Sequence, residues 1–377
     1  MKRGQIDMQL LIVVGVLLAI GTIMVLSASA PTAISESGDA FQYLKKQLLM
    51  LFFGGIGMLL ATLFNYKNYR KLAWPIFFGA LVLLLLVFSP LGHEVNGAKR
   101  WILFAGFTLQ PSEVMKFAIV ILVSYKLSKI NVKLENPKSY IVYAVLVIVI
   151  AGILQLQHHL SATVIIVLPI IILLLIAGMR KLYFALIGGV LVCGVGLLIA
   201  IEPFRLTRFF TFMNPLDPAN TQENGWQIVN SLMAIGSGGW FGKGLGQSVQ
   251  KFYLPEPQND FIFAIFIEEM GLIGGLIVLM LFGYLIYRGY TIAYHAPDKF
   301  SAYMAIGITS IIAIQVIMNI LVVISFMPVT GVSLPFFSYG GTSLIFLMIA
   351  MGILLNISRN SDTINKIKVS DETEKQE

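Results

Sequence analysis

The sequence contains a single cysteine, Cys193, and it lies inside an apolar run. One cysteine excludes an intramolecular disulfide and any metal site built from cysteine ligands. Charged residues are also scarce, since they make up 12% of the 377 residues while hydrophobic residues make up 57%. A soluble domain would precipitate with that balance, so the sequence predicts an integral membrane protein.

Three further absences exclude other classes of site. The net charge is +7, but the basic residues are scattered between apolar runs and form no dense tract, so no nucleic-acid partner is expected. Lys243 does not belong to a Walker A loop, because Gly244 follows it where that motif requires Ser or Thr. His158 and His159 have no third ligand at helical spacing, so no metal site is predicted.

Long apolar runs are what the sequence has in excess, and each approaches the ~20 residues that cross a bilayer. They cover residues 8–30, 46–64, 73–90, 112–128, 139–155, 162–177, 183–201, 260–287, 300–327 and 341–357. We therefore predict an all-α integral membrane protein with about ten transmembrane helices in a single domain, residues 1–357. The polar tail, residues 358–377, is expected to be short, disordered and cytoplasmic.

The distribution of lysine and arginine predicts the orientation of these spans. With a cytoplasmic N-terminus, the inside connections carry roughly twice as many of these residues as the outside ones. The C-terminus is then also cytoplasmic, and one large loop, residues 202–258, lies outside the cytoplasm between spans seven and eight. The first run ends in small residues at 27–30, as a signal peptide does, but it is too long for one and is predicted to be a retained helix.

A carboxylate stands where this loop ends and an apolar run begins. Asp260 follows the proline-punctuated segment 254–258. Two interpretations remain open. Asp260 could cap the helix, because Asp side chains accept hydrogen bonds from first-turn N–H groups. Alternatively it serves a function, since helical spacing places Asp260, Ala264 and Gly271 on one face, where small residues would leave a crevice beside the carboxylate.

Three outward-facing connections carry the other candidate residues. Lys116 lies one turn inside an apolar run and three residues after Glu113, so the two side chains can pair. Snorkelling to the membrane surface explains such a lysine as well as an anion site does. Lys243 lies in a glycine-rich stretch, residues 236–246, whose N–H groups could converge on a phosphate. A flexible interfacial loop is the alternative there.

The third connection leads into the last apolar run. Ser338, Gly340 and Gly341 form a small-residue turn before it. A turn of this kind at a helix N-terminus is suited to bind an anion, although simple capping by Ser338 accounts for the same residues.

Together these segments resemble a known family. The motifs lie at residues 97–102, 110–113, 235–239, 241–244, 254–260 and 334–341. Their order and spacing resemble the SEDS family, the shape, elongation, division and sporulation proteins, from about residue 7 to residue 356. Tyr253 to Glu256 and the end of the first run resemble the FtsW and SpoVE branch more than the related RodA.

One motif departs from the family pattern. The family usually has Gln-Pro-Asp-Leu-Gly-Thr where this chain reads Gln-His-His-Leu-Ser-Ala at residues 157–162. The acidic residue of the family is therefore His159 here, and no acidic role is assigned to it.

The resemblance implies a peptidoglycan glycosyltransferase of cell division or sporulation, at the outer face of the bacterial cytoplasmic membrane. Its substrate would be lipid II, the undecaprenyl-diphosphate-linked disaccharide-peptide. The implied partners are a class B penicillin-binding protein acting as transpeptidase and other division or sporulation membrane proteins, with the division septum as the expected location. A lipid-linked precursor flippase and an inactive scaffold are the alternatives.

An inverting reaction is expected, in which Asp260 accepts the proton of the attacking 4-hydroxyl of N-acetylglucosamine. A single carboxylate suffices because the lipid diphosphate leaves without protonation. A divalent cation could share the diphosphate charge, although no ligand cluster requires one and no other cofactor is expected. The residues predicted to bind substrate are Lys99, Arg100, Glu113, Lys116, Lys243, Glu256, Ser338, Gly340 and Gly341.

Overall fold

The computed structural model describes residues 4–95, 98–104, 107–129, 138–201, 203–215 and 225–373. Its long helices follow the predicted apolar runs: α1 (Met8–Ser37), α2 (Gln42–Leu63), α3 (Tyr66–Leu86), α4 (Pro111–Lys129), α5 (Lys138–Leu156), α6 (Leu160–Ile176), α7 (Lys181–Ile201), α10 (Ile262–Tyr294), α11 (Lys299–Val323) and α12 (Gly341–Thr373). Within the described chain, 6 helices are long and apolar enough to cross a membrane. The all-α membrane fold is confirmed, and the count of ten spans stays a prediction.

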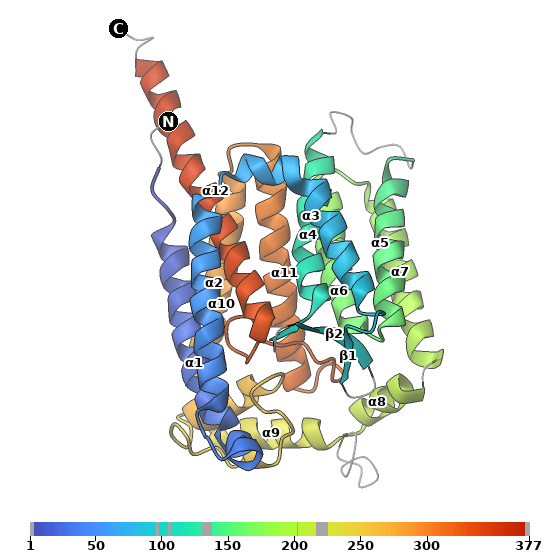
Figure 1. Ribbon diagram of the computed structural model, residues 1–377, viewed down its shortest axis with the longest axis vertical. Helices are drawn as coiled ribbons and strands as arrows, with labels where there is room; N and C mark the ends of the chain where they lie inside the picture. The colour runs from blue at the N-terminus through green and yellow to red at the C-terminus, as the bar shows by residue number, and fades with distance from the viewer. Residues whose placement is uncertain are drawn as a thin grey trace.

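The long helices lie side by side along the longest axis of the molecule (Figure 1). Both chain termini lie at one end. The opposite end holds α8 (Pro203–Met213), α9 (Trp226–Gly238), the short helix η1 (Gln250–Phe252) and a small sheet (Figure 1). These are the segments that the sequence predicts to lie outside the cytoplasm, so the fold gathers the candidate residues at one end of the bundle.

The sheet is a feature that the sequence analysis missed. Strands β1 (Gly92–Val95), β2 (Ala98–Phe104) and β3 (Phe107–Leu109) pair antiparallel in that order. Along β2, Ala98 and Ile102 are buried while Lys99 and Leu103 are exposed, which is the alternation of a half-buried strand. Strands this short give little periodic signal in a sequence, which explains the omission.

Two helices have features that the apolar runs alone do not show. Helix α12 extends to Thr373, past residue 358 where the predicted tail begins, and the disorder and cytoplasmic location of that tail stay predictions. In α10, Gly271 has φ 75° and ψ 178°, which interrupts the helix in a conformation that residues with a side chain avoid. The break frees backbone groups for other partners, and the Leu272 N–H donates to the Gly239 carbonyl at 2.8 Å.

The helices differ in how much apolar surface the protein itself covers. In the most apolar stretch of α11, 67% of the residues are buried, against 22% in α3. An apolar helix face left uncovered in a membrane protein contacts lipid, so α3 lies at the rim of the bundle and α11 near its centre. The central position of α11 brings its polar side chains, Gln315 and Asn319, to the candidate site.

Candidate active site

Asp260 lies just before α10 and does not cap it. The N-cap residue is Phe261, which makes no side-chain capping hydrogen bond. The Asp260 backbone carbonyl accepts a hydrogen bond from Asn319 Nδ2 at 2.8 Å, and the same amide donates to the Val332 carbonyl at 2.7 Å. Asn319 therefore ties the start of α10 to the segment after α11, and the capping interpretation of Asp260 is not what the structure shows.

The Asp260 carboxylate points toward a glycine turn. A Cβ added to Gly331, whose φ is 70°, would lie 3.5 Å from Asp260 Oδ2. Burial, together with the negative charge of Glu256, raises the pKa of Asp260 to about 6, while the Arg208 guanidinium acts in the opposite direction. A carboxylate with this pKa is still mostly ionised at neutral pH and is a stronger base than an ordinary Asp.

Arg208 is a site residue that the sequence analysis did not single out. It lies on α8 and donates a hydrogen bond to the Val329 carbonyl at 3.2 Å. Its positive charge lowers the pKa of Asp260, so it helps to keep that carboxylate ionised. One feature of the sequence could have identified Arg208. Basic residues are depleted in outward-facing loops, so an arginine in such a loop is unusual.

We expect the rate of glycan formation to rise as the pH increases through about 6, because Asp260 must be ionised to act as a general base. Arg208→Gln removes the charge that holds the pKa of Asp260 down, so the acidic limb should move to higher pH. Initial rates measured from about pH 5 to pH 8 check this. Lys45→Gln is the matched control, since Lys45 pairs with Asp39 on the exposed surface. Identical limbs in the two variants would contradict the assignment.

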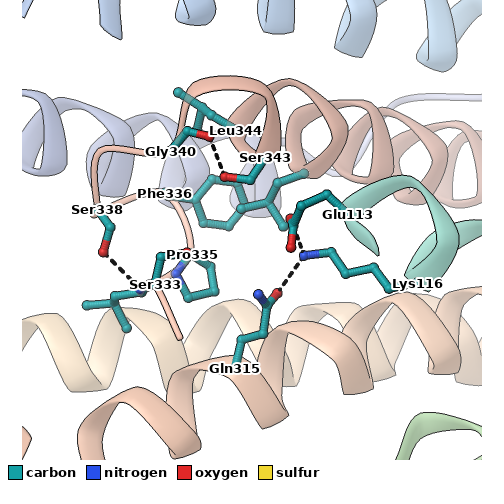
Figure 2. Close-up of a pocket in the computed structure, with 12 residues that line it drawn as sticks. Glu113, Lys116, Gln315, Ser333, Pro335, Phe336, Ser338, Gly340, Ser343 and Leu344 are labelled. Atoms are coloured by element: carbon teal, nitrogen blue, oxygen red, sulfur yellow. Dashed lines mark hydrogen bonds and ion pairs between the residues drawn. The ribbon is translucent and has the colours of Figure 1, made fainter. Parts of the chain in front are cut away.

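Lys116 is buried and paired, so it does not snorkel. Its side chain is 3% exposed, and its Nζ lies 2.6 Å from Glu113 Oε2 and 3.2 Å from Gln315 Oε1 of α11. Figure 2 shows these three side chains meeting at a small hollow, beside the turn that contains Ser338 and Gly340. The spacing of Glu113 and Lys116 predicted their pairing. Burying a lysine in a polar hollow is costly, which favours a functional role.

A second hollow adjoins the first and shares Glu113, Lys116 and Gln315 with it. Its wall also includes Gly331, the glycine that faces the Asp260 carboxylate. Asp260 lines neither hollow, and Gly331 is the residue that links its carboxylate to the wall that contains Lys116. In sequence the two are far apart, and no spacing rule relates them.

The turn before α12 is fixed by its own hydrogen bonds. The Leu334 N–H donates to Ser338 Oγ at 2.8 Å, and the Tyr339 N–H donates to the Gln258 carbonyl at 2.9 Å. Ser338 and Gly340 line the first hollow (Figure 2), while Gly341 is the first residue of α12. The turn is therefore held beside Asp260, and the role of these three residues in substrate binding stays a prediction.

Lys243 lies elsewhere, on the break in α10. Its Nζ is 2.7 Å from Glu268 Oε1, and Glu268, which is fully buried, also accepts hydrogen bonds from the Val249 and Gln250 N–H groups. Lys243 lines neither hollow. The structure gives its ammonium group a protein partner, and its predicted contact with phosphate stays a prediction. The sequence analysis did not use Glu268 and Glu269, two consecutive acidic residues inside an apolar run, which could have predicted that this region contains buried ion pairs.

Glycines of this loop fit tightly against α10. A Cβ at Gly242, where φ is 79°, would lie 2.2 Å from the Glu269 carbonyl oxygen. We expect Gly242→Val to lower the free energy of unfolding by ~2 kcal/mol or more. The loop at Gly242 and the backbone of α10 at Glu269 cannot move apart without breaking the hydrogen bonds around Glu268. Thermal unfolding of the purified protein in detergent measures this. Gly236→Ala is the control, since nothing lies within 4 Å of a Cβ there. Equal unfolding midpoints would show that the loop is only a spacer.

Three predicted residues lie at the edge of the site. Lys99 is exposed on β2. Arg100 donates hydrogen bonds to the Gln157 and His158 carbonyls, so it holds the turn before α6. Glu256 is exposed, with φ 47°, and accepts a hydrogen bond from Asn259 at 2.6 Å. Their contacts with substrate stay predictions. The described residues include no group of three or more His, Cys, Asp or Glu that could hold a metal ion.

A family model described as "Cell cycle protein", that of FtsW, RodA and SpoVE, matches residues 8–363. The chain belongs to the FtsW/RodA/SpoVE family. Stage V sporulation protein E of Bacillus subtilis (strain 168) is 42% identical over 366 residues, covering 96% of this chain and 99% of that protein. A protein of Trichlorobacter lovleyi named "Probable peptidoglycan glycosyltransferase FtsW" is 38% identical, covering 95% of this chain and 94% of its own.

Solved structures of FtsW/RodA/SpoVE-like fold agree. The crystal structure of RodA from Thermus thermophilus has a TM-score of 0.70 at 25% identity, covering 94% of this chain and 97% of that one. A chain in a structure described as "Structural coordination of polymerization and crosslinking by a peptidoglycan synthase complex" has a TM-score of 0.79 at 24% identity, covering 94% and 98%. The fold expected from the motifs is confirmed over nearly the whole chain.

Proposed function

We propose that this member of the FtsW/RodA/SpoVE family is a peptidoglycan glycosyltransferase that polymerises lipid II at the outer face of the bacterial cytoplasmic membrane. The observation that carries the proposal is the position of Asp260. Its carboxylate does not cap α10, its pKa is raised to about 6, and it adjoins, through Gly331, a hollow that contains the buried Lys116. Relatives named as probable peptidoglycan glycosyltransferases support the same activity.

In this proposal the transfer is inverting, with one carboxylate acting as the base. Asp260 accepts the proton from the 4-hydroxyl of the acceptor sugar as that oxygen bonds to the anomeric carbon of the donor. The bond from this carbon to the lipid diphosphate breaks, and the diphosphate leaves with the electron pair. Lys116 stabilises the charge on the leaving group, and Glu113 and Gln315 hold the ammonium in place. Asp260 thus acts on the acceptor sugar, and Lys116 acts on the diphosphate of the donor.

The finer biological assignment also belongs to this proposal. A class B penicillin-binding protein would crosslink the strands, and the chain would act in division or sporulation, with both termini in the cytoplasm. Two observations support the orientation: both termini lie at the end of the bundle opposite the candidate site (Figure 1), and basic residues concentrate in the connections predicted to be cytoplasmic.

Purified protein in liposomes that contain fluorescent lipid II tests the proposal against a flippase. Glycan is measured on gels before and after muramidase digestion, and lipid movement is measured by quenching from one side. We expect polymer that muramidase removes, with no more lipid movement than in protein-free liposomes. Lipid movement without polymer would instead identify a transporter.

A further inference from the structure

The second hollow lies between the N-termini of two helices. Its wall contains Gln110 and Ser112 at the start of α4, and His159 and Ser161 at the start of α6. The first N–H groups of a helix have no partner within the helix, and the helix dipole is positive there. Two such ends at one hollow create a region of positive potential, which favours an anion.

Two side-chain atoms in this wall are buried without a partner in the described structure. They are His159 Nδ1 and Ser112 Oγ, in residues that are 8% and 3% exposed. His159 is the N-cap residue of α6, yet its side chain makes no capping hydrogen bond. A buried polar atom left unsatisfied costs about 1–3 kcal/mol, so two of them in one hollow indicate that a ligand completes the site.

The charges around the hollow favour the same kind of ligand. Lys116 forms part of its wall, and Arg100 donates hydrogen bonds to the turn before α6. Burial and these two positive charges lower the pKa of His159 to about 3, so its imidazole is neutral and has one N–H to donate. Glu113 is the acidic residue of the wall, and Lys116 engages it at 2.6 Å.

We propose that this hollow binds a phosphate group of the lipid-linked donor, with His159 Nδ1 and Ser112 Oγ as hydrogen-bond donors beside Lys116. The inference rests on the proposed function and deepens it. A phosphate offers several acceptor oxygens, so one group satisfies both unpaired atoms and the ammonium together. The donor's own phosphate fits because the hollow reaches Gly331, which faces Asp260. The proposal places this phosphate at the starts of α4 and α6, and the contact of Lys243 with phosphate stays a separate prediction.

A direct binding experiment tests this site without turnover. The protein is placed in phosphatidylcholine nanodiscs and titrated with undecaprenyl diphosphate, and binding is followed by the shift in thermal unfolding. His159→Leu removes the N–H donor and should weaken binding about tenfold, as expected for one hydrogen bond to a charged group. His159→Asn keeps a donor close to the position of Nδ1 and should stay within about threefold of wild type. Ser112→Ala gives an independent variant and should also weaken binding.

The outcomes separate this inference from the proposed function. Wild-type affinity in both His159→Leu and Ser112→Ala would overturn the site. In a competition experiment, phosphatidylglycerol is added to the nanodiscs at the same surface density as undecaprenyl diphosphate. If it displaces the undecaprenyl diphosphate, the hollow binds the phosphate of bulk lipid, and the assignment to the donor is overturned. A wild-type protein that binds in this His159-dependent way but never polymerises lipid II would refute the proposed function and leave the phosphate site standing.

Discussion

Replacing Lys116 by methionine is expected to raise the lipid II concentration needed for half-maximal rate by about tenfold or more. Methionine keeps the length and apolar stem of the side chain but removes the charge that faces the hollow. Loss of a buried ionic partner costs about 3–5 kcal/mol, because the remaining charge is left uncompensated. Part of that cost falls on Glu113, which pairs with Lys116 at 2.6 Å, so folding and binding must be separated.

A double variant makes the separation. Lys116→Met with Glu113→Gln leaves no unpaired charge in the hollow, so the unfolding midpoint should return toward the wild-type value. Binding of lipid II should stay weak, because the Lys116 ammonium that contacts the diphosphate is absent. Recovery of both stability and activity in the double variant would show that the pair is structural. Polymerisation at limiting lipid II and thermal unfolding of the same samples supply the two readouts.

Asp260→Asn is expected to be produced, inserted and folded normally, and to form at least ~100-fold less glycan than wild type. Asparagine has the size of aspartate and caps a helix about as well, but it is not a base. The backbone carbonyl of residue 260 that accepts from Asn319 is untouched by the change. Asp260→Glu should lose nearly as much, because the extra methylene moves the carboxylate by more than a reacting geometry tolerates.

Asp298→Asn is the matched control for that substitution. Asp298 caps α11, and its side chain accepts a hydrogen bond from the Ser301 N–H at 2.9 Å. Asparagine can accept the same bond, so this variant should polymerise lipid II at close to the wild-type rate. The two substitutions are chemically identical and both stand at the start of a long helix. A difference between them isolates the basicity of Asp260.

The features that could be predicted from the sequence depend on local pattern. Apolar runs near ~20 residues located the long helices, because a membrane span must satisfy its backbone internally and face lipid. The run at 260–287 corresponds to α10, which begins at Ile262. The Glu113–Lys116 pair was predictable for the same reason, since a separation of three residues places both side chains on one helix face.

The features that could not be predicted depend on contacts between distant segments. Lys243 pairs with Glu268, which lies in another element, and no periodicity connects a loop to the break in a helix. The backbone of Asp260 is held by Asn319, 59 residues away, so its apparent suitability as a cap was misleading. His159 departs from the family motif, and its meaning emerges only when Ser112 and Lys116 are found on the same wall.

The central claim, that Asp260 is the base of a glycosyl transfer, is tested most directly by one comparison. Wild type, Asp260→Asn and Asp298→Asn are reconstituted in liposomes at saturating lipid II, and glycan is measured per molecule of inserted protein. We expect glycan from wild type and Asp298→Asn, and at least ~100-fold less from Asp260→Asn. Glycan from Asp260→Asn at a substantial fraction of the wild-type amount would contradict it and direct the search for the base to Glu256 or Glu113.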